Sequence, residues 1–217
     1  MKKILFFLIV LTIAKVQAQG LKGEGKVAGK IKLLSTQLRS RGVDTIFVYQ
    51  RNSYGYNLFN IPKGSTKKQI DSLACEAREA AYVFWLSKGL MHAQKLHPCI
   101  LFDSVQLENS KISHFIGRQS ILRAPEIKPF QYRDKQGKTL TTYDEHIVQM
   151  TLTLRLGTEE REILVNSDAL SKRIFEIEAV NINYEENNNN LWAQLATIAN
   201  EEVKALNFKR VLIDNGN

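Results

Sequence analysis

The chain has 217 residues, of which 44% are hydrophobic and 24% charged, and its formal net charge is +8. These values are ordinary for a globular protein, and the chain is long enough to bury a core as one domain or two small ones. After the first 18 residues no segment is apolar and long enough for a transmembrane helix, so none is expected in the rest of the chain.

The N-terminus has the pattern of a secretory signal peptide. Lys2 and Lys3 precede an apolar run over residues 4–14, and Val16 and Ala18 are the small residues that a signal peptidase accepts before its cleavage point. A membrane anchor would need roughly 20 apolar residues, about twice the length of this run. We therefore expect a signal peptide over residues 1–18, and a mature chain that is exported to the periplasm, the cell surface or the medium.

The exported chain remains basic. The signal peptide removes three lysines and no acid, which lowers the net charge to +5. Residues 19–28, rich in glycine and lysine, are expected to form a flexible basic leader. The basic residues of this region and of the segment after it are opposed by Glu24 alone: Lys22, Lys26, Lys30, Lys32, Arg39 and Arg41. Such a cluster suits either a polyanionic partner or the solvated face of a helix.

The first half of the chain reads as mainly helical. Apolar residues at helical spacing predict a helix over about 29–40, which Gly42 ends. A β-branched and aromatic run predicts a strand over 44–50. The broadest apolar face follows Ser65 and predicts the clearest helix of the chain, ending near Gly89, with a further helical turn to about Leu96. Its apolar positions are Ile70, Leu73, Ala74, Ala77, Ala81, Phe84 and Trp85.

After Pro98 the pattern changes to that of β-strands. Short strands are expected over 100–107 and 115–122, and a longer one over 173–184 whose apolar phase slips between Ile177 and Val180. Residues 130–133 and 139–143 flank a turn-forming segment and predict a hairpin.

The strand over 146–156 has the cleanest alternation, with one buried and one solvated face, and residues 161–165 are its expected hairpin partner. Residues 185–190 predict a polar loop, with Asn187 to Asn190 as a plain solvated turn. A last helix is expected over about 191–206, and a short strand at 211–213. Together these elements predict a single α+β domain over 29–217, with a mainly antiparallel meandering sheet packed with two or three helices.

Cys75 and Cys99 are the two cysteines of the chain. An oxidising compartment allows them to pair, which makes them a disulfide candidate. The alternative is two buried free thiols, since cysteine also serves as a small apolar residue.

The histidines are the side chains that most invite a catalytic or metal hypothesis: His92, His97, His114 and His146. Imidazole and thiolate both suit zinc, and Cys99 lies close to two of the histidines. A spacing of five residues nevertheless places His92 and His97 on poorly matched faces of a helix, and Pro98 breaks the helix before Cys99. No nucleophile elbow and no phosphate-binding loop occur either. We predict no metal, no cofactor and no catalytic residue.

The segment over 51–57 is the best candidate for recognition. It mixes arginine, tyrosine, asparagine, serine and glycine, which are common on binding surfaces. The candidate binding residues are Arg51, Tyr54, Tyr56 and Asn57. The alternative is a loop whose tyrosines cover an edge of the core.

These observations favour an exported, non-enzymatic envelope protein that binds another protein or a glycan, with an immunity or inhibitor protein as one form of it. No specific nucleic-acid partner is expected. The alternative is an exported hydrolase or metal-dependent enzyme whose site contains histidine.

Overall fold

The computed structural model describes residues 27–53, 64–66, 80–117, 119–142, 148–174 and 179–211. Outside these residues lie the expected signal peptide, most of the leader, and several residues named above: Tyr54, Tyr56, Asn57, Cys75 and His146. In the described part of the chain, no helix has the length and apolar character needed to cross a membrane.

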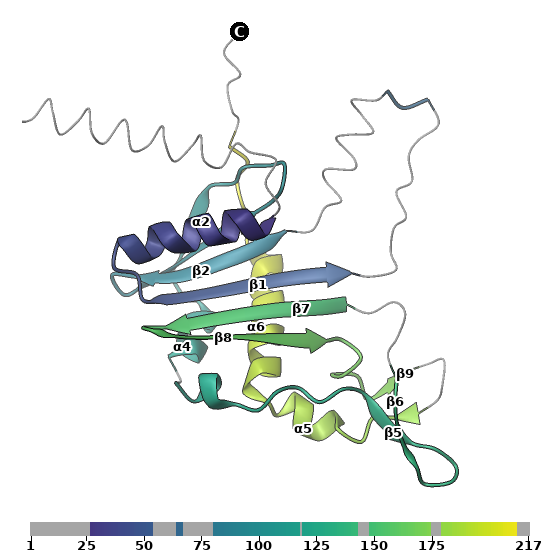
Figure 1. The fold of residues 1–217 in the computed structure, drawn as a ribbon. Helices are drawn as coiled ribbons and strands as arrows, with labels where there is room; N and C mark the ends of the chain where they lie inside the picture. The colour runs from purple at the N-terminus through teal and green to yellow at the C-terminus, as the bar shows by residue number, and fades with distance from the viewer. Residues whose placement is uncertain are drawn as a thin grey trace, which may run out of the picture.

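A six-stranded antiparallel sheet forms the centre of the molecule (Figure 1). Its strand order is β4 (Ser104–Leu107), β3 (Leu90–Leu96), β2 (Ala81–Ser87), β1 (Thr45–Ser53), β7 (Val148–Leu156) and β8 (Glu159–Asn166). Each neighbouring pair is antiparallel. The predicted α+β fold with a meandering antiparallel sheet is confirmed.

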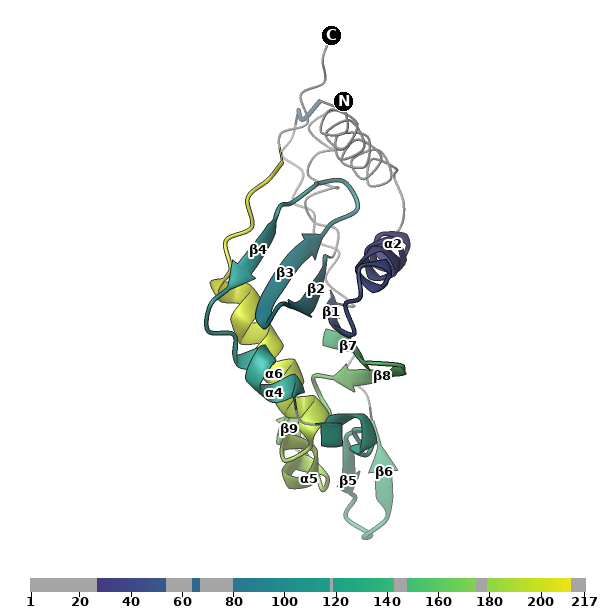
Figure 2. The ribbon, with the colours of Figure 1, turned by 90° about the vertical axis from the view of Figure 1, so that its left-hand side faces the viewer.

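Helices lie on both faces of this sheet (Figure 2). The helix α2 (Val27–Ser40) lies on one face, which we call the outer face. The helix α6 (Leu191–Ala205) crosses the other, the inner face, together with the shorter α4 (Lys111–Ile116) and the 3₁₀ turn η1 (Gln119–Arg123). The predicted helices over 29–40 and 191–206 are therefore confirmed.

The larger core fills the space between the inner face and α6. Phe47 and Phe84 stack in it with ring centroids 5.8 Å apart, and Trp192 of α6 is fully buried against the sheet. A smaller core lies between α2 and the outer face, with Ile46 and Val83 buried beneath Leu38. The alternation of side chains along β1 sends neighbouring residues into these two different cores.

The predicted helix ending near Gly89 is wrong where the structure describes it, because residues 81–87 and 90–96 form the β2–β3 hairpin. Its two-residue turn has positive φ at Lys88 (52°) and Gly89 (77°), the backbone that a tight hairpin requires. The strand β2 lies between both cores, so both of its faces are apolar and the alternation that marks a strand is lost. Periodicity alone cannot separate such a short apolar run from a helix.

Two strands predicted in the second half of the chain differ in the structure. The strand expected over 115–122 is wrong, because α4 and η1 occupy this region, and the Ser110 side chain caps α4 by accepting a hydrogen bond from Ser113 N at 3.2 Å. The strand expected over 100–107 is shortened to β4 and an isolated bridge between Phe102 and Arg210.

The hairpins were predicted more accurately. β5 (Gln131–Arg133) pairs with β6 (Thr139–Thr141), and β7 pairs with β8. Of the single strand expected over 173–184, the structure describes two short strands, β9 (Arg173–Ile174) and β10 (Ala179–Val180), which pair with each other antiparallel. The chain then enters α5 (Tyr184–Asn188) instead of continuing as a strand.

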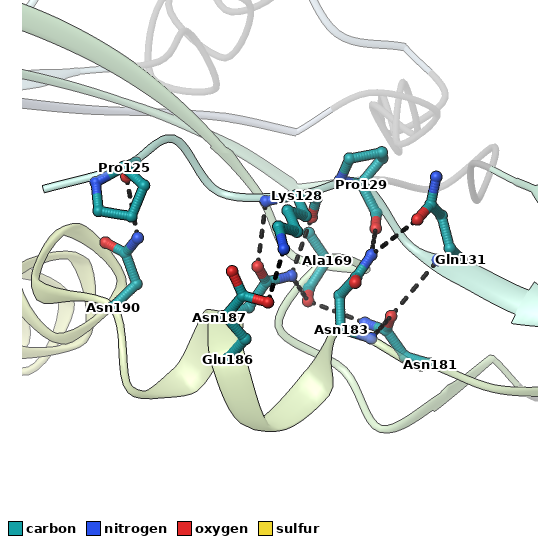
Figure 3. A network of polar contacts seen from close by, with 10 residues as sticks. All are labelled: Pro125, Lys128, Pro129, Gln131, Ala169, Asn181, Asn183, Glu186, Asn187 and Asn190. Atoms are coloured by element: carbon teal, nitrogen blue, oxygen red, sulfur yellow. Dashed lines mark hydrogen bonds and ion pairs between the residues drawn. The ribbon is translucent and has the colours of Figure 1, made fainter.

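The polar loop expected over 185–190 is also wrong, because residues 185–188 belong to α5 and Asn190 is the N-cap of α6, in a region held by buried asparagines (Figure 3). We call the buried asparagines of this region the asparagine cluster: Asn181, Asn183, Asn187 and Asn190. Asn187 Nδ2 donates to the carbonyls of Lys128 and Ala169, each at 2.8 Å, and its Oδ1 accepts from Lys128 N at 3.0 Å. Asn187 is thus not part of a solvated turn.

The other members of the asparagine cluster bind the backbone in the same way. Asn181 Nδ2 donates to the carbonyls of Ala169 and Ser171, and Asn183 Nδ2 donates to the carbonyl of Pro129 at 3.0 Å. Asn190 Oδ1 accepts from Trp192 N at 2.8 Å and so caps α6, while its Nδ2 donates to the carbonyl of Pro125 at 2.9 Å. The asparagine cluster therefore fixes segment 125–131, which leads into β5, against α5 and the start of α6.

Candidate functional site: a groove on the outer face of the sheet

The outer face of the sheet is covered by α2 over only part of its width (Figure 2). The helix packs against β2 and β3, where the outer face is apolar. Across β7 and β8 the outer side chains are mainly polar, and the β7–β8 register places them in facing pairs. We call this region the polar shelf: Gln149, Thr151, Thr153 and Arg155 of β7, and Glu160, Glu162, Leu164 and Asn166 of β8. Leu164, its one large apolar side chain, is 50% exposed.

A groove of about 340 Å³ runs between α2 and the polar shelf. Its floor comes from two neighbouring strands: Ile46, Val48 and Gln50 of β1, and Thr151 and Thr153 of β7. One wall is a face of α2: Ala28, Ile31, Lys32, Ser35 and Arg39. The other wall consists of Arg155, Glu160 and Glu162. Every one of these residues lies in the described part of the chain.

The two walls of the groove differ in charge. The α2 wall carries Lys32 and Arg39, both exposed. On the opposite wall, Glu162 accepts a hydrogen bond from Thr153 Oγ1 at 3.2 Å, and Glu160 Oε2 lies 3.4 Å from Arg155 Nη1. Cations thus face carboxylates across a floor of β-branched, hydroxyl and amide side chains.

The α2 side of the groove is held in place by a buried lysine. Lys30 Nζ donates to the carbonyls of His97 and Pro98, at 2.8 and 3.1 Å, and ties the helix to the end of β3. Burial lowers the pKa of the Lys30 ammonium group below its ordinary value. Lys30 therefore has a structural position, and the solvated basic residues left on and next to α2 are Lys32, Arg39 and Arg41.

The candidate recognition residues are only partly described. Arg51 lies in β1 opposite Met150 of β7, and its side chain is exposed. By the alternation of β1 it belongs to the inner face, with Tyr49, and not to the groove. Tyr54, Tyr56 and Asn57 lie outside the described residues, so recognition by this loop stays a prediction.

The three described histidines occupy three separate settings. His92 stacks on Trp85 with ring centroids 5.4 Å apart, on the outer face of β3. His97 is buried, and its Nδ1 lies 3.3 Å from Cys99 N, while His114 Nδ1 lies 3.1 Å from the Ser110 carbonyl in α4. Within the described ranges, no group of three or more histidine, cysteine, aspartate or glutamate side chains is arranged to hold a metal ion.

The cysteines are described in part. Cys99 is exposed and is not a free thiol, so the alternative of two buried free thiols is wrong for this residue. Cys75 lies outside the described residues, and the Cys75–Cys99 disulfide therefore stays a prediction.

The groove was not predicted from the sequence, although one of its parts was. The alternation over 146–156 correctly indicated a solvated face on β7. No local sequence pattern indicated that β1 and β7, about 100 residues apart, are neighbouring strands and share this face beside α2. No protein-family model, no curated protein and no solved structure matches this chain. The groove is therefore interpreted from its own geometry.

Proposed function

We propose that the mature chain is an exported, non-enzymatic envelope protein that binds a segment of a partner protein in the groove between α2 and the polar shelf. The observation that carries this proposal is the difference in charge between the two walls. Lys32 and Arg39 lie on one, and the two glutamates Glu160 and Glu162 outnumber Arg155 on the other. A peptide segment can present both signs of charge, and its backbone can hydrogen-bond to the floor. Complementary charge of this kind favours specificity and the rate of association.

A glycan is the second ligand class that the groove supports. Thr151, Thr153 and Gln50 offer hydroxyl and amide groups that can hydrogen-bond to sugar hydroxyls. A neutral glycan would leave the charged walls without partners, and for this reason the protein segment is preferred. The hydrolase or metal-enzyme alternative gains no support from the separate settings of the three described histidines. Metal analysis of untagged protein tests that alternative independently.

A site-specific cross-linking experiment tests the groove directly. A photo-reactive amino acid replaces Thr151 on the groove floor, or Thr139 on β6 as the matched control, since β6 lies away from the groove (Figure 1). The proteins are expressed with their native N-terminus, recovered from the envelope fraction and irradiated there. We expect a single, stoichiometric protein adduct from position 151 and none from position 139.

A blocking variant makes the test quantitative. Thr151→Tyr fills the groove with a ring, whereas Thr139→Tyr makes the same change on exposed β6. The Thr151→Tyr variant should capture the partner identified at position 151 at least about tenfold less than the wild-type protein does. The Thr139→Tyr variant should capture it as well as the wild-type protein. Equal capture by both variants would show that the groove is not the binding site. Selective binding to a glycan array, lost in Thr151→Tyr, would move the proposal to the glycan class.

A further inference from the structure

The two edges of the six-stranded sheet differ in length and in what lies beside them. At one edge, β4 has four residues, and the chain just before it is paired with the C-terminal segment, since Asp103 N donates to the carbonyl of Lys209 at 3.0 Å. At the other edge, β8 runs for eight residues with a continuous register to β7. Beyond β8 the described part of the chain adds no further strand to this sheet (Figure 1). A long edge of this kind is a template for another strand.

The hydrogen bonds around β8 show which of its backbone groups face this free edge. Ser167 N donates to the carbonyl of Val148 at 2.8 Å, so the register joins the odd-numbered residues of β8 to β7 by hydrogen bonds. In an antiparallel pair, the residues between them turn their N–H and C=O groups away from the partner strand. Glu160, Glu162 and Leu164 are such residues, and no described residue forms a hydrogen bond with their backbone groups. These groups remain available to an added strand.

The core holds β8 in the extended conformation that an added strand needs. Ile163 and Val165 are buried on the inner face. Glu160 and Glu162 are exposed on the outer face, and Leu164 is 50% exposed. The edge is thus preorganised for pairing, which lowers the entropic cost of binding.

The side chains of the edge select which strand can pair with it. Glu160 lies 3.4 Å from Arg155 of β7, whereas Glu162 forms no ion pair with any described residue. An added strand places a side chain opposite each glutamate, at a Cβ separation of about 5 Å, where opposite charges attract and like charges repel. A second copy of β8 would bring its own glutamates to this junction. The edge therefore favours a strand with cations opposite the glutamates and an apolar side chain opposite Leu164.

We propose that the free edge of β8 binds an extended, basic segment of a partner protein, which joins the sheet as an antiparallel strand. Hydrogen bonds to the β8 backbone supply affinity, and the alternate side chains supply specificity: an apolar residue opposite Leu164, and Lys or Arg opposite Glu162 and Glu160. The groove is lined by side chains on the other side of these glutamates. The edge is therefore a second binding surface, and pairing there does not require the groove to be occupied.

Amide hydrogen exchange of the mature protein, followed by NMR, tests the edge directly. The probe is the peptide Thr-Val-Thr-Lys-Thr-Lys-Thr, whose Val and two Lys residues would face Leu164, Glu162 and Glu160. In the free protein, the amides of these three residues should exchange at least about tenfold faster than those of Arg161 and Ile163, which bond to β7. Saturating peptide should slow them at least about tenfold. Unchanged exchange with the peptide would overturn the proposal.

Two variants at one position separate backbone pairing from side-chain contact. Leu164→Pro removes an outward N–H, which an edge strand tolerates because the ladder to β7 stays intact. Binding of the labelled peptide, measured by fluorescence anisotropy, should fall at least about tenfold. Leu164→Ala keeps the N–H and is the matched control, with an expected loss below about threefold. An equal loss in both variants would show that the backbone of this edge does not bind the peptide.

A charge reversal keeps the test valid if the proline variant does not fold. Glu162→Lys should weaken binding of the basic peptide at least about fivefold, and strengthen binding of the same peptide with Glu in place of Lys. Thr151→Tyr, which fills the groove, should leave binding of the basic peptide unchanged. Loss of binding in Thr151→Tyr would place the peptide in the groove and overturn the edge proposal alone. Slow exchange of the outward amides in the free protein, with a dimer in sedimentation, would overturn it in favour of a second copy.

Discussion

The asparagine cluster and the groove are both rich in polar side chains, but they use their hydrogen-bonding groups in different ways. In the asparagine cluster the amides are buried, and Asn183, Asn187 and Asn190 bind backbone carbonyls 54 to 65 residues away in the chain. In the groove, polar side chains such as Thr151 and Lys32 face an open volume. A polar run in the sequence can therefore hold a fold together or remain available to a partner, and burial decides between the two.

The energetic consequences of the two arrangements are opposite. Removing one member of a buried hydrogen bond leaves its partner desolvated and unpaired, at a cost of about 1–3 kcal/mol. Removing a charge or a hydroxyl from an exposed surface changes the free energy of unfolding by only about 0–1 kcal/mol. Substitutions in the asparagine cluster should therefore act on stability, and substitutions in the groove should act on binding.

The largest effect on stability is expected for Asn187→Ala. This change removes three hydrogen bonds and leaves the N–H and carbonyl of Lys128 and the carbonyl of Ala169 without the Asn187 amide. We expect the free energy of unfolding to fall by about 3 kcal/mol, measured by urea denaturation.

Its neighbour provides the matched control. Asn188 is exposed, although its Nδ2 also donates to two carbonyls, those of Tyr184 and Leu170. Water can replace these bonds, so Asn188→Ala should cost less than about 1 kcal/mol. A similar loss in both variants would mean that burial does not separate the two kinds of polar site.

A smaller effect is expected for Asn190→Ala, which removes the cap of α6. The Asn190 side chain accepts from Trp192 N and donates to the carbonyl of Pro125. Loss of an N-cap costs about 0.5–2 kcal/mol, and the unpaired Pro125 carbonyl places the expected loss in the upper half of that range. Asn190→Ser keeps an acceptor for the cap and should recover part of the loss in the same denaturation experiment.

The parts of the fold that have a local sequence pattern could be predicted from the sequence. The helices α2 and α6 and the β7–β8 hairpin have one apolar and one polar side, and each was predicted from its own periodicity. The strand β2 was misassigned because packing on both faces removes that periodicity. Asn187 and Asn190 were misread as part of a solvated turn because their partners, such as Lys128 and Pro125, lie far away in the chain.

The candidate site could be predicted only in fragments for the same reason. The polar face of β7 was visible in the alternation, and the basic residues of α2 were visible in the composition. Their juxtaposition depends on the pairing of β1 with β7 and on the position of α2 beside them. Neither of these has a local signal in one sequence.

The smallest effect on stability, and the sharpest contrast with the asparagine cluster, is expected for Glu160→Lys. Glu160 lies on the acidic wall of the groove, and its pair with Arg155 is at 3.4 Å with the glutamate side chain 53% exposed. An exposed pair of this kind contributes about 0–1 kcal/mol, so the free energy of unfolding should hardly change. The charge reversal should nevertheless slow association with a partner that presents cations to this wall, and high salt should reduce the difference.

Glu159→Lys is the matched control for this last prediction, because it makes the same charge change at the neighbouring exposed residue of β8, which does not line the groove. Association rates are compared for both variants with the partner captured at position 151. A selective decrease in Glu160→Lys at unchanged stability would show that the charge of the groove wall serves binding and not folding. Equal rates in both variants would remove the charge complementarity on which the proposed function depends.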